Sequence, residues 1–195
     1  MKRVLEKIQG AFSKKNEPEV IVLMDIDGVL SFEGSPTDED FIVISHGWGR
    51  WRIRDEVLEW LKNLASDKQV EIMWLSTWGD DSNIINQYLA IPDFKAIGNS
   101  EGVEAETKIE QTLKVVQGLK DKTVIVVDDA LSVKPSCMSM SENAALVRLW
   151  DRLTSVCHEN KIATQFVTPD VWSGIVKEEM KFVDELVESV KFEKE

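Results

Sequence analysis

The sequence predicts an α/β fold with a doubly wound parallel sheet of about five strands, and two observations lead to this expectation. Short apolar runs, each closed by polar or turn residues, are typical of strands buried on both faces. These runs alternate along the chain with segments whose apolar residues repeat at helical spacing. Such alternation indicates a parallel sheet with helices on both faces.

Five segments are expected to form the strands. The four clearest apolar runs lie at residues 20–24, 70–75, 123–127 and 162–167. A weaker run at residues 94–97 follows Pro92 and ends at Gly98. Helical spacing in the intervals predicts helices over residues 54–65, 82–90, 106–119 and 141–157.

Residues 41–54 have a different pattern, which predicts a β-hairpin. Both arms alternate in polarity, and two glycines lie at the turn between them. In the second arm Arg50, Arg52 and Arg54 point one way, while Trp51 and Ile53 point the other. The arginines could form a solvated face over an aromatic core, or they could offer guanidinium groups to an anionic ligand.

The two ends of the chain are expected to form helices that flank a single central domain. Val4, Ile8 and Phe12 repeat at a spacing of four, and the pattern ends near Pro18. A similar pattern covers residues 175–192. We therefore expect a helix at 1–17, an α/β domain at 18–175 and a helix at 176–195. Packing on the core is the simpler role for both helices, with partner binding as the alternative.

Composition limits the partners of the protein. The chain has 23 Lys and Arg against 35 Asp and Glu, so its net charge of −12 disfavours nonspecific binding to a phosphate backbone. Two cysteines, Cys137 and Cys157, form no disulfide framework, which favours a reducing, cytoplasmic compartment. The chain also lacks a signal-peptide core and any apolar run of about 18 residues, so we expect no contact with a membrane.

Two carboxylates follow the first strand, at Asp25 and Asp27, and Gly28 allows a sharp turn just beyond them. Two anions this close repel each other unless a cation neutralises one or a proton sits on the other. The pair therefore suits a magnesium-assisted nucleophile with an acid/base partner. The alternative is a strand end with two solvated acids.

The segment Asp-x-Asp-Gly-Val after a hydrophobic strand resembles the first motif of the haloacid dehalogenase (HAD) superfamily of phosphotransferases. Three further segments resemble the later motifs of this family, in the same order. The second is Ser76 and Thr77 after a hydrophobic strand, and the third is Lys108 in a helix before the next strand. The fourth is the acidic pair Asp128 and Asp129. The resemblance implies a Rossmann-like, HAD-like domain.

The resemblance also implies a role for each motif residue. Asp25 would be the nucleophile that forms an aspartyl-phosphate, and Asp27 would protonate the leaving oxygen and then activate water. Ser76 or Thr77, together with Lys108, would hold the phosphoryl oxygens. Magnesium would be bound by Asp25, Asp128 and the backbone carbonyl of Asp27, while Asp129 would support these ligands or reach the ion through water.

Some of these assignments have competitors. Ser76 is favoured over Thr77 because it directly follows the apolar run. Lys95 and Lys134 also lie near motifs, but neither begins a helix that leads into the strand at 123–127. Lys108 could alternatively be an ordinary exposed charge on its helix.

Aromatic and basic residues beside the motifs suggest weaker contacts with substrate. Trp78 could stack on a base or sugar ring, whereas Trp74, inside a strand, is better explained as core. Arg50, Arg52 and Arg54 of the hairpin could serve a single terminal phosphate.

The spacing of the motifs leaves no room for the cap domain that many relatives insert. The intervals 30–70 and 78–108 each contain only a few expected elements. By family analogy, a capless site suits a bulky substrate such as a nucleic-acid end, a nucleotide or a phosphoprotein, or else closure by another subunit.

A narrower resemblance concerns the segment from Trp74 to Trp78 with Asn83 beyond it, followed by the acidic pair. These residues resemble a capless subgroup of the superfamily associated with RNA-repair proteins. The chain departs from that subgroup at residues 168–174, where a Gly-Leu-Thr segment is common, and over 130–161. These departures weaken the inference of a nucleic-acid substrate more than the inference of phosphatase chemistry.

Together these features predict a magnesium-dependent phosphomonoester hydrolase that works through an aspartyl-phosphate. One alternative is a binding or regulatory module that retains the fold without turnover. Another is a phosphotransferase that delivers the phosphoryl group to an acceptor other than water.

Overall fold

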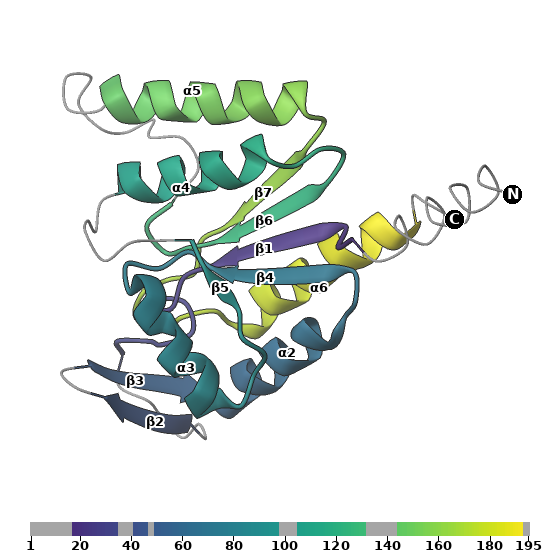
Figure 1. The fold of residues 1–195 in the computed structure, drawn as a ribbon. Helices are drawn as coiled ribbons and strands as arrows, with labels where there is room; N and C mark the ends of the chain where they lie inside the picture. Colours follow the sequence, from purple (N-terminus) through teal and green to yellow (C-terminus); the bar gives the residue numbers. More distant parts are fainter. Residues whose placement is uncertain (1–16, 35–40, 47–48, 98–104, 132–143, 193–195) are drawn as a thin grey trace, which may run out of the picture.

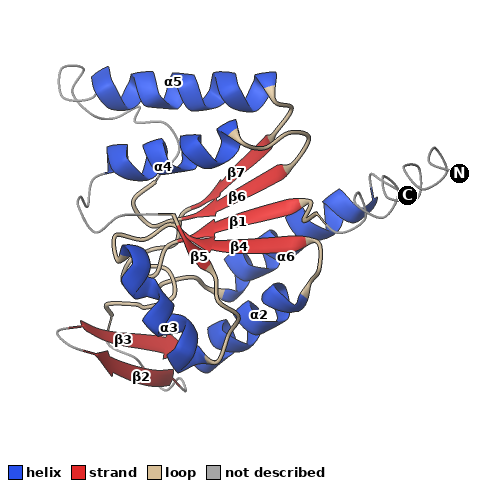
Figure 2. Ribbon diagram, viewed as in Figure 1, coloured by secondary structure: helices blue, strands red, loops and turns tan. Residues whose placement is uncertain are grey.

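The computed structural model describes residues 17–34, 41–46, 49–97, 105–131 and 144–192. Its centre is a sheet of five parallel strands in the order β5-β4-β1-β6-β7 (Figure 2). The strands are β1 (Val20–Met24), β4 (Val70–Trp74), β5 (Lys95–Ala96), β6 (Thr123–Val127) and β7 (Ala163–Val167). The predicted parallel sheet of about five strands is therefore confirmed.

The central strand β1 is buried on both faces, as its uninterrupted apolar run predicts. Successive side chains point to opposite faces of the sheet. Accordingly Val20, Val22 and Met24 lie in one apolar cluster, whereas Ile21 and Leu23 lie in another. Each cluster is completed by different helices.

One face of the sheet packs against α2 (Asp55–Ser66) and α6 (Lys177–Phe192), and the other against α4 (Ala105–Gln117) and α5 (Ala144–Glu159) (Figure 1). The short helix α3 (Ser82–Leu89) joins the α2 and α6 side, where its Ile85 and Leu89 are buried. Helices on both faces confirm the doubly wound arrangement.

The predicted hairpin is also present. Strands β2 (Phe41–His46) and β3 (Gly49–Arg54) pair antiparallel, with Phe41 opposite Arg54. They lie on the same side of the sheet as α2 and α6 (Figure 1), and Trp51 and Ile53 are buried in the apolar cluster there. The described residues between β1 and β4 form only this hairpin, α2 and the connections, so they contain no cap domain.

Element boundaries differ slightly from the expected ones. Helix α6 begins at Lys177, where the Glu179 side chain accepts a hydrogen bond from the Val176 N–H at 3.0 Å and satisfies a free helix-start donor. Helix α3 ends at Leu89 because Ala90 adopts the left-handed conformation (φ 51°). The expected N-terminal helix at 1–17 lies almost entirely outside the described residues, as do Lys134, Cys137 and the start of the helix expected at 141.

No helix among the described residues is long and apolar enough to cross a membrane.

Candidate functional site

Three motif residues lie at the carboxyl ends of adjacent strands. Asp25 follows β1, Ser76 follows β4 by two residues, and Asp128 follows β6. The strand ladder fixes two of them, because the Asp25 N–H donates to the Val127 carbonyl at 2.9 Å and the Asp128 N–H to the Val167 carbonyl at 3.0 Å. This edge is where ligands bind in open α/β sheets.

Lys108 extends from α4 to bind both Asp25 and Asp128. Its Nζ forms an ion pair with Asp25 Oδ2 and lies 2.6 Å from Asp128 Oδ2. The three residues are at most 6% exposed. Lys108 is therefore not an exposed helix charge, and its competitor Lys95 instead pairs with Glu71 at the surface, at 3.4 Å.

This buried cluster shifts the acidity of its members. Burial raises the pKa of Asp25, the ammonium of Lys108 lowers it and the neighbouring Asp128 raises it, so that the net pKa is about 7. Burial alone would lower the pKa of Lys108, but the two carboxylates outweigh it and raise that pKa. Without another cation, two acids share one lysine.

The acids at this edge fit a divalent metal ion. One carboxylate oxygen each from Asp25, Asp128 and Asp129 lies within 4.8 Å of the others. Asp128 Oδ1 accepts the N–H groups of Ala130 and Leu131, both at 2.9 Å. Its Oδ2 is buried and, among the described residues, accepts no hydrogen bond although Lys108 is close.

The Lys108 ammonium lies 2.6 Å from Asp128 Oδ2, but it also pairs with Asp25, so two buried carboxylates share one positive charge. Burial and the neighbouring Asp128 also raise the pKa of Asp129, although the ammonium of Lys108 acts in the opposite direction. Clustered carboxylate oxygens are the donors that Mg²⁺ prefers. The chemistry of this donor set therefore fits magnesium.

Asp27 has a different environment from Asp25. Its side chain is exposed, and both of its oxygens accept hydrogen bonds from tryptophans. Trp51 Nε1 donates to Oδ1 at 3.1 Å and Trp78 Nε1 donates to Oδ2 at 2.6 Å. The two rings contact each other edge to face, with centroids 4.8 Å apart.

The turn after Asp27 requires glycine at position 28. Gly28 has a φ of +76°, and its N–H donates to the Ser31 carbonyl at 2.8 Å. A Cβ at this position would lie 2.5 Å from the Asp129 carboxyl carbon. The close approach brings the fourth motif against the loop of the first.

The second motif provides two hydroxyl groups, as the sequence indicated. Ser76 is buried, and its Oγ accepts the Trp78 N–H at 3.5 Å, while Thr77 is partly exposed. The favoured role of Ser76 in holding phosphate stays a prediction.

Two of the three hairpin arginines contact other parts of the protein. Arg52 Nη1 donates to the Gly34 carbonyl at 2.8 Å, and Arg54 Nη1 donates to the Ile175 carbonyl at 3.4 Å. Both guanidinium groups lie over the Phe32 ring, at 5.9 and 4.6 Å from its centroid. Arg50 is exposed. Contact of Arg50, Arg52 or Trp78 with substrate stays a prediction.

Sequence reasoning did not identify Trp51 as part of the site. The alternation of the hairpin correctly placed its ring on the core side, but gave no indication that its N–H reaches Asp27. That contact joins residues 24 positions apart and depends on how the hairpin docks.

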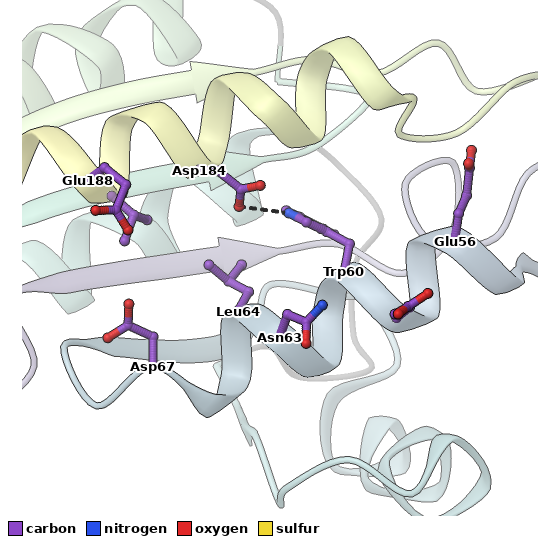
Figure 3. A pocket seen from close by; sticks show the side chains of 9 residues that line it. Glu56, Trp60, Asn63, Leu64, Asp67, Asp184 and Glu188 are labelled. Carbon is purple, nitrogen blue, oxygen red and sulfur yellow. Dashed lines mark hydrogen bonds between the residues drawn. The ribbon is translucent and has the colours of Figure 1, made fainter.

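A cleft of about 510 Å³ lies elsewhere, between α2 and α6. The Trp60 indole lies between the helices and donates to Asp184 Oδ1 at 2.9 Å (Figure 3). Its lining includes five acidic residues and none of the predicted site residues. The acids are Glu56, Glu59, Asp67, Asp184 and Glu188.

Comparison with known families agrees with this site. Residues 21–148 match the family described as the HAD domain in Swiss Army Knife RNA repair proteins. The chain belongs to this family. The matched HAD segment includes all four motifs from Asp25 to Asp129 and ends within α5. The family indicates a hydrolase of the phosphatase type. Comparison with curated proteins found no match.

Proposed function

We propose that the protein is a magnesium-dependent phosphomonoester hydrolase that works through an aspartyl-phosphate. The observation that supports this most directly is the buried contact of Asp25 with Lys108, beside Asp128 and Asp129. A nucleophile, a cation for phosphoryl oxygens and a set of metal ligands would then occupy one edge of the sheet.

In the first step a carboxylate oxygen of Asp25 forms a bond to phosphorus while the bond from phosphorus to the leaving oxygen breaks. Asp27 gives its proton to that leaving oxygen. In the second step Asp27 takes a proton from water, and the resulting hydroxide attacks phosphorus. The aspartyl bond breaks, phosphate leaves, and the Asp25 carboxylate is restored.

The different surroundings of the two acids support this division of roles. Asp25 is buried against Lys108, which suits a nucleophile held in one place. Asp27 is exposed, which suits a group that exchanges protons with a leaving group and with water. When magnesium is bound, its charge would offset the repulsion between the carboxylates and the phosphoryl oxygens.

The substrate we propose is a bulky phosphomonoester, with a nucleic-acid end as one candidate. The absence of a cap from the described intervals supports an open site, and the family's association with RNA repair supports a nucleic acid. The net charge of −12 argues against a long footprint on a phosphate backbone. A short contact around one terminal phosphate is compatible both with a nucleic-acid substrate and with the negative net charge.

Phosphate release from purified protein with magnesium tests the proposal. The panel would contain nucleotides, sugar phosphates, phosphopeptides and oligonucleotides with terminal phosphates. Asp25→Asn should reduce turnover by more than about a thousandfold, because it removes the nucleophile. The matched control is Asp93→Asn, which changes an exposed loop carboxylate and should retain full activity.

Equal activity of the Asp25→Asn variant and the wild type would contradict the proposed mechanism. Silence across the panel, with or without added alcohol acceptors, would instead favour the binding module without turnover. A phosphorylated acceptor as the main product would indicate a phosphotransferase.

A further inference from the structure

The Asp27 carboxylate is held by two elements that are distant in sequence. Trp51 lies on β3 of the hairpin, and Trp78 lies in the turn after β4. Each donates its indole N–H to a different oxygen of Asp27, at 3.1 and 2.6 Å. An exposed aspartate with one partner at most would rotate about two side-chain bonds, whereas two donors fix the plane of its carboxyl group.

The donors are themselves held in place. Trp51 is only 2% exposed, and its ring touches that of Trp78. The hairpin is also bonded to the loop that follows Asp27. The Arg52 N–H donates to Ser31 Oγ at 3.2 Å, and the Phe32 N–H donates to the Arg52 carbonyl at 3.3 Å. The distance between the Trp51 ring and the Asp27 loop is therefore fixed by the backbone.

The chemistry of the indole group limits where a proton on Asp27 can lie. An indole N–H can donate a hydrogen bond but cannot accept one. Neither tryptophan can therefore take the proton of Asp27, and the proton cannot point along either indole contact. It must lie on a side of the carboxyl group that neither indole N–H occupies.

We propose that Trp51 and Trp78 are positioning residues that direct the proton of Asp27 toward the leaving group and, later, toward water. This inference rests on the proposed phosphatase function, in which Asp27 is the acid and base. It assigns to the hairpin a catalytic purpose that does not require its arginines to touch the substrate.

The test is the replacement of each tryptophan by phenylalanine, which keeps an aromatic ring and removes the N–H. Trp78→Phe is the main variant because Trp78 is only partly buried, and Trp51→Phe is the second. The matched control is Trp60→Phe. It removes an indole N–H that also binds a carboxylate, that of Asp184 at 2.9 Å, but between α2 and α6.

Two substrates with different leaving groups distinguish a misplaced Asp27 from a general loss of active-site structure. With β-glycerophosphate the leaving alkoxide needs a proton, so kcat/KM should fall roughly 10- to 100-fold in Trp78→Phe and Trp51→Phe. With p-nitrophenyl phosphate the leaving group needs little protonation, and kcat/KM should fall less than about threefold. Trp60→Phe should match the wild type with both substrates.

The second step gives an independent signal. If Asp27 is misplaced as a base, hydrolysis of the aspartyl-phosphate slows after nitrophenol has already left. Trp78→Phe should then show a burst of nitrophenol stoichiometric with the enzyme, followed by slow turnover. Equal losses of kcat/KM with both substrates, or no loss with either, would overturn the inference.

A measurement without turnover separates this inference from the proposed function. In ¹H–¹⁵N spectra, Asp27→Asn should move two indole N–H signals, which Trp51→Phe and Trp78→Phe identify by removing one each. If these signals move as expected but the wild type hydrolyses neither substrate, the contact is structural and both proposals fail. An active wild type with unaffected tryptophan variants would reject the positioning role alone.

Discussion

Among single residues, Asp25 has the environment that most affects the rest of the site. Its carboxylate is buried, accepts the Ile26 N–H at 2.7 Å and contacts Lys108, which it shares with Asp128. A single lysine cannot fully neutralise two buried acids. The metal-free protein should therefore resist ionisation of Asp25, which is what its raised pKa expresses.

This resistance predicts how stability depends on pH in the absence of metal. The pKa of Asp25 rises from 3.8 in the unfolded chain to about 7 in the fold. Its favourable contribution is fully present below pH 3.8 and is lost as the pH rises through 7. We expect the free energy of unfolding of the wild type to fall, relative to Asp25→Asn, by on the order of 4 kcal/mol across this window.

Urea denaturation in a chelating buffer, at several pH values between 4 and 8, measures this difference. The Asp93→Asn variant should follow the wild type, because Asp93 is an exposed loop residue. Parallel curves for the wild type and Asp25→Asn would show that Asp25 is ionised at no cost, and would contradict the prediction.

Single residues also show what the sequence can and cannot predict about the site. Asp25 and Asp128 could be predicted because each directly follows an apolar strand, and parallel strands bring their ends together. Lys108 could be predicted from its place in the motif order. The contact of Trp51 with Asp27 could not, because it depends on side-chain packing across the hairpin.

At the scale of elements, the hairpin and the loop after β1 form one unit. Arg52 connects them through its backbone to Ser31 and Phe32 and through its side chain to the Gly34 carbonyl. The segment after β7 joins the same unit, because the Gly34 N–H donates to the Trp172 carbonyl at 2.9 Å. Two other parts of the chain, the hairpin and the segment after β7, thus support the loop that contains Asp27.

The side chain of Arg52 should therefore contribute to stability. Arg52→Ala removes a charged donor to a carbonyl at 2.8 Å and a cation over the Phe32 ring. We expect the free energy of unfolding to fall by about 1 kcal/mol, since the side chain is only partly buried. Arg50→Ala, on the exposed end of the same strand, should change it by less than about 0.5 kcal/mol.

Chemical denaturation of the two variants gives the comparison, and steady-state kinetics on each completes it. Equal stability of Arg52→Ala and the wild type would show that the observed bonds do not stabilise the hairpin. A rise of KM in Arg50→Ala alone would assign the contact with an anionic substrate to that exposed arginine.

The bounds of helices and strands were predictable where hydrophobic periodicity was strong. They were less predictable where tertiary contacts determine where an element begins or ends. The apolar run of β1 is unambiguous, and its observed bounds equal the expected residues 20–24. Strand β5 is reduced to Lys95–Ala96 because only two of its residues pair with β4. The start of α6 depends on the Glu179 side chain, which periodicity does not reveal.

At the scale of the whole molecule, acidic residues occur in two different settings. One set lies at the carboxyl edge of the sheet and includes the buried Asp25 and Asp128. The other lines the cleft between α2 and α6 (Figure 3). One of its members, Asp67, pairs with Lys191 at 2.8 Å. The sequence predicts the first set from its motifs, but the second arises only when helices about 120 residues apart pack together.

These two settings must be separated before magnesium binding can be assigned to the site. A protein with a net charge of −12 is stabilised by any cation that screens its self-repulsion. A specific ion that binds only the folded state adds about 2.7 kcal/mol when its concentration is 100 times the dissociation constant. We therefore expect magnesium chloride to raise Tm more than sodium chloride of equal ionic strength.

The additional rise of Tm with magnesium chloride, called the excess below, should depend on Asp128 and on pH. Asp128→Asn should abolish it, because it removes one of the three clustered carboxylates that could hold the ion. Glu188→Gln, in the cleft between α2 and α6, should retain it. The excess should also grow from pH 5 to pH 8, since Asp25 and Asp129 have raised pKa values and must lose protons to bind a cation. An equal rise of Tm with both salts, or an excess that survives Asp128→Asn and disappears in Glu188→Gln, would move the metal from the sheet edge to the cleft or to the general surface.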